Sequence, residues 1–507
     1  MAIIITIILY FSVLLLISRR MGKGSNDAFF RAGRKSAWQL VAFGMIGASI
    51  SGVTFVSVPG MVLNSDMTYL QMCMGFWVGY LVVAFVLLPI YYRYNLTSIY
   101  SYLDRRLGRT SRKTGSWFFI ASKLTGSAAK LYLVCLILEH ALGVDFTLIV
   151  VVTLILIWLY THRSGTLTLV WTDALQTLCM LVALVLILIQ VASLLKLNVS
   201  EAFSAVWNDP HSRIFEFDDW SSRQHFLKQF LSGVFVVIVM TGLDQDMMQK
   251  NLTCRTLRDG QKDLCSYGIL FLPVNFLFMA LGVLLAQYYN SQGMALPENG
   301  DALLPKLVTD GVLGQAALIF FTLGIIAAAF SSADSALTAL TTSFCVDILE
   351  DSSNEHKRKG VHICMTAVFL FIVLAFRWIG SQSVIDLIYT LVGYTYGPLL
   401  GLFAFALFTR RMPRQRLVPY VAIASPLLCY AIDQLSQHLW NYHFGYELLM
   451  FNGLITFLGL WSLSSEKGGM LLLQKCKRDV RRRKKAGKNR LAIEKKTQRM
   501  CFFTFSE

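Results

Sequence analysis

The chain has 507 residues, of which 55% are hydrophobic and 15% are charged. Apolar runs of 18 residues or more recur from Ala2 to about Ser464, a pattern that excludes a soluble globular protein and is typical of a polytopic membrane protein. The 46 Lys and Arg residues exceed the 30 Asp and Glu residues. They gather in alternate loops, which argues against a nucleic-acid partner.

The apolar segments predict about 13 transmembrane helices, because each segment is close to the length that a helix needs to cross a bilayer. We expect an all-α polytopic membrane protein in which residues 1–465 form one membrane domain and residues 466–507 form a basic tail. The predicted spans lie at about residues 2–18, 37–62, 70–92, 115–141, 146–162, 167–194, 226–249, 263–288, 315–346, 361–380, 383–408, 417–437 and 446–464.

The basic residues also predict the orientation of the chain. With the N-terminus outside, most Lys and Arg residues fall in internal loops or in the tail, as the positive-inside rule requires. An odd number of spans then places the tail, which includes KCKRDVRRRKKAGKNR, in the cytoplasm beside anionic headgroups. We therefore expect a multi-pass protein of the cell membrane with its N-terminus outside and its C-terminus cytoplasmic.

Two spans carry glycines and polar residues at depths where a membrane helix is normally apolar. The second span reads FGMIGASISGVTFVSVPG, and the seventh ends in MTGLDQDMMQKNL. A helix is poorly favoured at such positions, and unwound backbone is tolerated in a membrane only where it lines a cavity. The two segments therefore predict discontinuous helices beside a binding site.

The two interrupted spans are five spans apart, which predicts an internal repeat. A repeat with an odd number of helices runs in the opposite direction in its second copy, so we expect a 5+5 inverted repeat with the binding site near the midplane. The predicted units are a first repeat at about 37–194, a second repeat at about 226–408, and additional helices at 1–18 and 417–464.

The ninth span contains the stretch GIIAAAFSSADSALTAL, from Gly324 to Leu340. A carboxylate at membrane depth costs at least about 2.5 kcal/mol, so Asp334 is expected to face a partner, a cavity or an ion. The serine hydroxyls lie near helix carbonyls three or four residues back, which favours a site for a small cation. The alternative is a seam of small residues in which the serines hydrogen-bond to their own helix.

Together these segments resemble the sodium:solute symporter family, whose members carry proline, sugars, sialic acid, pantothenate or iodide. The resemblance covers spans two to eleven. It rests on SISGVTFVSVPG in the second span, LVWTDALQ at Leu169–Gln176, LDQDMMQK in the seventh span, AAAFSSADSALTAL with VDI in the ninth, and YTYGPLLGLF in the eleventh. It implies a LeuT-type transporter in which sodium is the coupling ion and no organic cofactor takes part.

The family's conserved sodium site joins the break in the second span to the ninth span. Carried over by motif, the resemblance implies that the backbone carbonyls of Gly47, Ile50 and Ala328 and the hydroxyls of Ser331 and Ser332 bind sodium. The chemistry agrees, because carbonyls freed by unwinding and neutral hydroxyls replace water around a hard cation without a fixed charge.

Some family members have a second sodium site nearby, and the resemblance places it here at Asp173, Ser331, Asp334 and Ser335. Asp173 and Asp334 are predicted to reach the same inner half of the membrane, with no fixed base near them. Two acids at one depth share either a cation or a proton. Asp173 is alternatively a helix-entry residue near the headgroups.

The candidate substrate residues are Ser51, Thr54, Gln71, Gln245 and Asp246, at or facing the two breaks. The basic residue that carriers of carboxylated sugars place in the fourth span is replaced here by small residues. Lys123 and Lys130 lie on one face of that span, but Lys130 could also pair with an acid or extend to the interface. The seventh-span acids favour a polyhydroxylated or amine-bearing solute, or only cap the interrupted helix.

The leading hypothesis is a secondary active symporter that uses the inward sodium gradient to import a small polar organic solute by alternating access. The solute is a sugar, a carboxylated sugar, an amino acid or a related molecule. A proton-coupled carrier and a transporter-like sensor or channel are the alternatives. We do not expect an enzyme, because metal-ligand spacings and a nucleophile elbow are absent from the sequence. The expected partners are the solute, sodium and the bilayer, and the chain is expected to work as a monomer.

Overall fold

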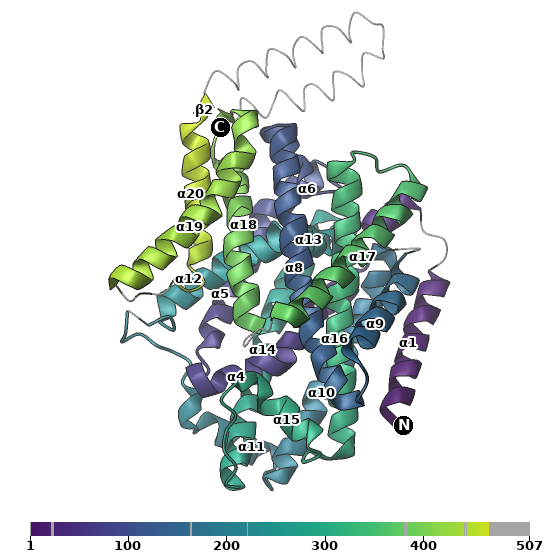
Figure 1. Cartoon of the computed structure of the whole chain (residues 1–507), viewed down its shortest axis with the longest axis vertical. Coiled ribbons are helices and arrows are strands. Elements are labelled where there is room, and N and C mark those ends of the chain that lie inside the picture. The colour runs from purple at the N-terminus through teal and green to yellow at the C-terminus, as the bar shows by residue number, and fades with distance from the viewer. Residues whose placement is uncertain are drawn as a thin grey trace, which may run out of the picture.

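The computed structural model describes residues 2–21, 25–162, 165–220, 222–379, 384–440, 442 and 444–465. Helices make up nearly all of this part of the chain (Figure 1). Within it, the one sheet is the antiparallel pair of β1 (Met412–Pro413) and β2 (Ser464–Ser465). The predicted cytoplasmic tail at 466–507 lies outside the described residues.

The first half of the chain supplies the first six predicted spans. Each of these coincides with a long helix or with a pair of consecutive helices. The elements are α1 (Ala2–Arg20), α2 (Asn26–Arg31), a 3-10 turn (Ala32–Arg34), α3 (Trp38–Ser49), α4 (Gly52–Ser65), α5 (Tyr69–Val82), a π-helical turn (Val83–Leu87), α6 (Leu88–Arg93), α7 (Ser101–Arg106), α8 (Arg109–Leu142), α9 (Phe146–Thr161), α10 (Thr166–Leu194), α11 (Val199–Trp207) and a 3-10 turn (Pro210–Ser212).

The second half supplies the other seven predicted spans, again at helical segments. Its elements are α12 (Phe226–Val237), a π-helical turn (Ile238–Gly242), α13 (Gln245–Asn251), α14 (Leu257–Ser291), a 3-10 turn (Gly300–Ala302), α15 (Leu303–Thr309), α16 (Gly314–Ser343), a π-helical turn (Phe344–Ile348), α17 (Glu355–Ile379), α18 (Val384–Phe408), a 3-10 turn (Gln415–Leu417), α19 (Val418–Trp440) and α20 (Leu448–Ser462).

The described helices that are long and apolar enough to cross a membrane number seven, or up to nine if each bent pair counts as one span. Several predicted spans, such as α9 and α20, fall on shorter apolar helices. The thirteen predicted positions therefore all coincide with helices, while thirteen crossings remain a prediction.

Both predicted interruptions are present as sharp bends. The axes of α3 and α4 differ by 61° across Ile50 and Ser51, and the axes of α12 and α13 differ by 70° at Leu243 and Asp244. The carboxylate of Asp244 accepts from the backbone N–H groups of Asp246 and Met247, so it caps the new helix. Each bend therefore leaves helix ends, with their unpaired backbone groups, inside the bundle.

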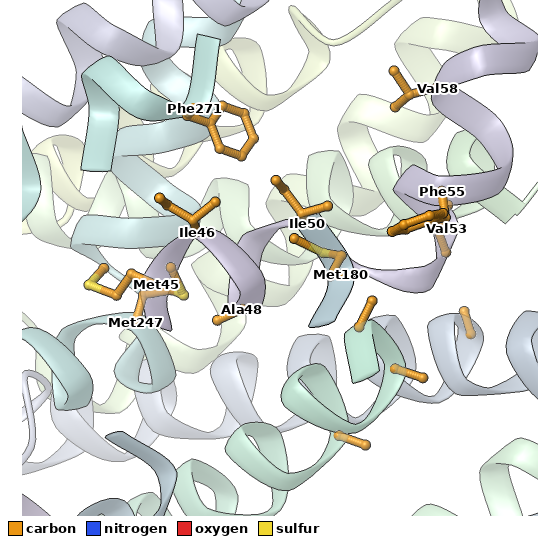
Figure 2. Packing of buried hydrophobic residues seen from close by; sticks show 14 of the residues in the cluster. Met45, Ile46, Ala48, Ile50, Val53, Phe55, Val58, Met180, Met247 and Phe271 are labelled. Carbon is orange, nitrogen blue, oxygen red and sulfur yellow. The ribbon is translucent and has the colours of Figure 1, made fainter. Parts of the chain in front are cut away.

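Small residues let the polar helices approach each other closely. A Cβ atom on Gly44 would lie 3.0 Å from the Cβ of Asp173, and one on Gly324 would lie 3.0 Å from the Cβ of Ala183. The helix α10 therefore packs tightly against both α3 and α16. Figure 2 shows the break itself, with Ile50 between the helical segments that carry Ala48 and Val53.

The first and last helices lie at the edges of this bundle. The helix α1 runs along one side next to α9, and α19 and α20 lie on the opposite side of the view (Figure 1). The Phe11 ring of α1 packs against Phe330 of α16, with the ring centroids 4.9 Å apart. The break in α3–α4 and the polar part of α16 are therefore enclosed by other helices.

Candidate functional site

The end of α3 is held against α10 by a contact that only glycine permits. The N–H of Gly47 donates to Oγ1 of Thr177 at 3.1 Å, and a Cβ on Gly47 would lie 2.1 Å from that oxygen. The last backbone bond of α3 joins the N–H of Ile50 to the carbonyl of Ile46. The backbone carbonyls that follow Ile46 therefore accept no further hydrogen bond of the α3 helix and are available to a cation.

The facing serines of α16 are deeply buried and differ in their bonding. The hydroxyl of Ser331 donates to Oδ1 of Asp173 at 2.8 Å. The hydroxyl of Ser332 has no hydrogen-bond partner among the described residues, although that side chain is only 6% exposed. A buried unpaired hydroxyl costs about 1–3 kcal/mol, which a bound cation would offset. The backbone of Ala328 lies one turn earlier on the same helix.

The sequence predicted that no fixed base would lie near Asp173, and this prediction was wrong. The Nζ atom of Lys250 lies 2.8 Å from Oδ2 of Asp173, and the two side chains are 3% and 1% exposed. Lys250 comes from α13, which the 70° bend turns into contact with α3, α10 and α16. This burial and pairing also argue against Asp173 as a helix-entry residue that faces headgroups.

The second acid, Asp334, lies in the same buried region and is bound by hydroxyls. Tyr160 of α9 donates to Oδ2 of Asp334 at 2.7 Å, and Ser335 donates to Oδ1 at 3.2 Å. The sequence analysis missed Tyr160, because an aromatic residue in a predominantly apolar span gives no signal of a polar contact. All four residues of the predicted second cation site are therefore buried close to the interface of α10 and α16.

A cavity of about 130 Å³ lies between the α3–α4 break, α5, α8, α12 with its π-helical turn, α13 and α14. Ser51 and Thr54 line it, as the sequence analysis expected. Its other lining residues are Ala48, Ser49, Val53, Val58, Tyr69, Phe76, Tyr80, Lys123, Lys130, Val236, Val237, Met240, Thr241, Asp244, Met247 and Phe271.

Gln71 and Gln245 are not among the lining residues and instead hold loops on either side of the bundle. The side chain of Gln71 accepts from the N–H of Glu216 at 3.2 Å and donates to the carbonyl of Gln224 at 2.9 Å. The side chain of Gln245 accepts from the N–H of Ile99 at 2.9 Å. Both glutamines therefore fix the segments next to the broken helices.

The two acids of the α13 break pair with a lysine of the protein. The Nζ atom of Lys123 on α8 lies 3.2 Å from Oδ2 of Asp244 and 2.8 Å from Oδ2 of Asp246. Tyr396 of α18 also donates to Asp244 at 2.6 Å. The sequence did offer a signal for this tyrosine, since Tyr396 belongs to the motif YTYGPLLGLF.

Lys130 lies two turns beyond Lys123 on the same helix and also lines the cavity. Among the described residues it makes no ion pair, whereas Lys123 is held by two acids. The described part of the chain therefore does not contain the predicted alternative, an ion pair between Lys130 and an acid. The ammonium of Lys130 faces the cavity without a direct ion pair to any described residue, and the nearby acids Asp244 and Asp246 are held by Lys123.

A helical membrane bundle with two broken helices, a polar packed helix and a cavity at the breaks is the architecture of a secondary transporter with the LeuT fold. Residues 29–416 match the model of the sodium:solute symporter family. The chain belongs to this family.

Two relatives and one solved structure illustrate the similarity. The sodium/sialic acid symporter NanT of Aliivibrio fischeri is 28% identical over 77% of this chain and 79% of that protein. The sodium/sialic acid symporter SiaT of Proteus mirabilis is 26% identical over 79% of this chain and 84% of that protein. A substrate-bound, outward-open Na+-coupled sialic acid symporter aligns with a TM-score of 0.77 at 20% identity, covering 93% of this chain and 98% of that one.

The predicted fold class and the general function are confirmed by these comparisons. The chain is an integral membrane protein with the fold of LeuT-type transporters, and it is a sodium-coupled symporter of a small solute rather than an enzyme. The sensor, channel and proton-coupled alternatives are therefore set aside.

Proposed function

We propose that this symporter imports a small organic anion, with a carboxylated sugar of the sialic acid kind as the leading substrate. The observation that carries the proposal is the partly buried ammonium of Lys130, which lines the cavity and has no acidic partner among the described residues. Ammonium–carboxylate bonds are among the stronger hydrogen bonds in proteins. The similarity to NanT and SiaT, whose names specify sialic acid, supports the same class of solute.

The residues around Lys130 suit the rest of such a molecule. Ser51, Thr54 and Thr241 offer hydroxyls to the sugar hydroxyls, and Tyr69 and Tyr80 offer aromatic walls. We propose that Gln71, Gln245 and Asp246 act by positioning the surrounding segments and Lys123. A cavity of about 130 Å³ is smaller than the 300 Å³ or more of usual ligand sites. Binding of a sugar acid therefore requires the broken helices to move apart, as alternating access demands.

Uptake into proteoliposomes tests the proposed substrate class. With an inward sodium gradient, radiolabelled sialic acid should accumulate, and with a potassium gradient it should not. An excess of unlabelled carboxylated sugar should compete, whereas a neutral N-acetylated sugar of similar size that lacks the carboxylate should not. Equal competition by the neutral sugar, or accumulation that does not depend on sodium, would refute the proposal.

We propose that the first sodium ion binds between the break in α3–α4 and α16, at the carbonyls of Gly47, Ile50 and Ala328 and the hydroxyls of Ser331 and Ser332. The ending of α3 at Ile50 and the unpaired buried hydroxyl of Ser332 support this site. Five neutral oxygen atoms suit sodium, because they replace water without adding a fixed charge.

Replacing Ser332 with Ala should weaken sodium binding while the fold survives. Losing one hydroxyl ligand costs about 1–3 kcal/mol, which corresponds to a roughly 5- to 150-fold rise in the half-saturating sodium concentration of uptake. Thr322→Ala is the matched control, since Thr322 is a buried residue of the same helix whose hydroxyl already bonds to the carbonyl of Leu318. An unchanged sodium dependence in Ser332→Ala would favour the small-residue packing seam instead.

We further propose a second cation site at Asp173, Ser331, Asp334 and Ser335. Its support is the hydrogen bond from Ser331 to Asp173 and the bonding of Asp334 to Ser335. Two acids with one lysine leave one negative charge in the region when both acids are ionised. A sodium ion or a proton at Asp334 would neutralise that charge.

The arrangement across the membrane is also a proposal. We propose an outside N-terminus, a cytoplasmic basic tail at 466–507, inverted repeats at about 37–194 and 226–408, additional helices at 1–18 and 417–464, and function as a monomer. The distribution of Lys and Arg supports this orientation. A reporter fused after Lys467 should be cytoplasmic and one inserted near Asn290 external, and the reverse result at either point would contradict the thirteen-span topology.

A further inference from the structure

Lys250 is a buried cation that the coupling mechanism above does not use. Its Nζ atom lies 2.8 Å from Oδ2 of Asp173, and both side chains are almost fully buried. Neither atom has a partner at hydrogen-bond geometry among the described residues. Opposite charge, rather than a directed hydrogen bond, therefore holds the two groups together, and such a contact can be exchanged for another cation.

The backbone that carries Lys250 is fixed beside the proposed second cation site. The neighbouring Gln249 donates to Oγ1 of Thr166 on α10 at 2.6 Å and to Oγ1 of Thr342 on α16 at 3.0 Å. The carbonyl of Lys250 accepts from Thr253 at 2.7 Å. The backbone at Lys250 is therefore fixed, and any displacement of the ammonium must come from rotation about the bonds of the four-carbon stem.

Asp173 connects this lysine with the cation ligands of α16. Its Oδ1 atom accepts from Ser331, a residue of both proposed cation sites, and its Oδ2 atom faces the ammonium. A sodium ion bound to Asp173 would have to lie within a few ångströms of the ammonium. Two like charges at that separation in a poorly solvated interior repel strongly, so both cannot occupy the carboxylate together.

We propose that Lys250 is a tethered cation that occupies the second cation site and competes with sodium for Asp173. The inference rests on the proposed second site. With the ammonium in place, Asp173 is neutralised without sodium, a proton neutralises Asp334, and transport draws on the first sodium site alone. A second sodium ion binds at Asp173 only when the lysine side chain moves away. Lys250 therefore sets how many sodium ions accompany each solute molecule.

Replacing Lys250 with Met removes the charge and keeps a stem of similar length. In proteoliposomes, the unmodified chain should show a hyperbolic dependence of initial uptake on sodium, and Lys250→Met should show a sigmoidal one. The sodium-induced rise in melting temperature of the purified protein should appear at a sodium concentration at least about tenfold lower in Lys250→Met than in the unmodified chain. Lys250→Arg, which keeps the charge, should behave like the unmodified chain.

A double variant, Lys250→Met with Asp173→Asn, restores a neutral pair and should return to a hyperbolic dependence. If Lys250→Met alone does not give folded protein, Lys250→Gln, which also removes the charge, takes its place in both measurements with the same expected results. A sigmoidal curve in the unmodified chain, or an unchanged sodium titration in folded Lys250→Met, overturns it. The melting-temperature measurement needs no solute, so its result stands even if the proposed anion is not transported.

Discussion

Lys130→Ala is expected to abolish most sodium-driven uptake of the anionic solute. Removing one partner of a partly buried, hydrogen-bonded charge pair costs about 2–5 kcal/mol, which is a loss of roughly 30-fold to several thousandfold in affinity. The loss should appear as a rise in the half-saturating solute concentration, measured at saturating sodium in proteoliposomes. The half-saturating sodium concentration should change little, because Lys130 is not among the proposed sodium ligands.

Two variants on the same helix serve as controls for this result. Lys130→Arg keeps the positive charge and should retain measurable uptake, with weaker affinity because a guanidinium is larger and planar. Lys113→Ala removes a lysine near the start of α8 that pairs with Glu350 and does not line the cavity. It should leave uptake unchanged. Normal affinity in Lys130→Ala would mean that the carboxylate is bound elsewhere or that the solute is not an anion.

Lys123→Met should cause the largest loss of stability among the variants considered. The substitution leaves Asp244 and Asp246 buried without their shared cation, and breaking a buried pair in this way costs about 3–5 kcal/mol. The melting temperature of the purified protein should fall clearly, and the yield of folded protein with it. The loss of the lysine should affect the position of Asp244 most, because this carboxylate also caps α13 and accepts a hydrogen bond from Tyr396.

Restoring the charge balance should recover part of this loss. The double variant Lys123→Met with Asp246→Asn removes one acid together with the lysine and should melt at a higher temperature than Lys123→Met alone. Asp246→Asn by itself leaves Lys123 paired with Asp244 and should be the mildest of the three. A double variant that is no more stable than Lys123→Met would show that packing of the lysine stem, rather than its charge, holds α8 to α13.

The helical organisation and both breaks were predictable, because a bilayer requires long apolar helices and makes polar or glycine-rich positions within them conspicuous in the sequence. Glycines around Gly47 and the acids at Asp244 stand out against apolar spans, and the cost of polar groups in lipid makes such positions informative. The burial of Ser331, Ser332 and Asp334 in a tightly packed helix followed from the same reasoning. The resemblance to a family then suggested which oxygen atoms would bind sodium.

The partners of the polar residues were not predictable, because they depend on the direction of short segments after each bend. Lys250 falls just beyond the predicted seventh span, which ends at about residue 249, yet the bend before α13 brings it against Asp173. Gln71 and Gln245 were predicted to face the substrate, but whether an amide faces a cavity or a loop is decided by side-chain rotations that a span boundary does not specify. That Lys130 makes no ion pair among the described residues likewise required the packed structure.

The pairing of Lys250 with Asp173 also has an electrical consequence. A unit charge that crosses the whole membrane potential gains about 2.3 kcal/mol per 100 mV. While the pair is intact it has no net charge, so an empty carrier that reorients with the pair intact moves no charge at this position. Once sodium replaces the ammonium, the lysine must carry its own charge through part of the same field. The membrane voltage then acts on the carrier through a side chain of the protein as well as through the transported ion.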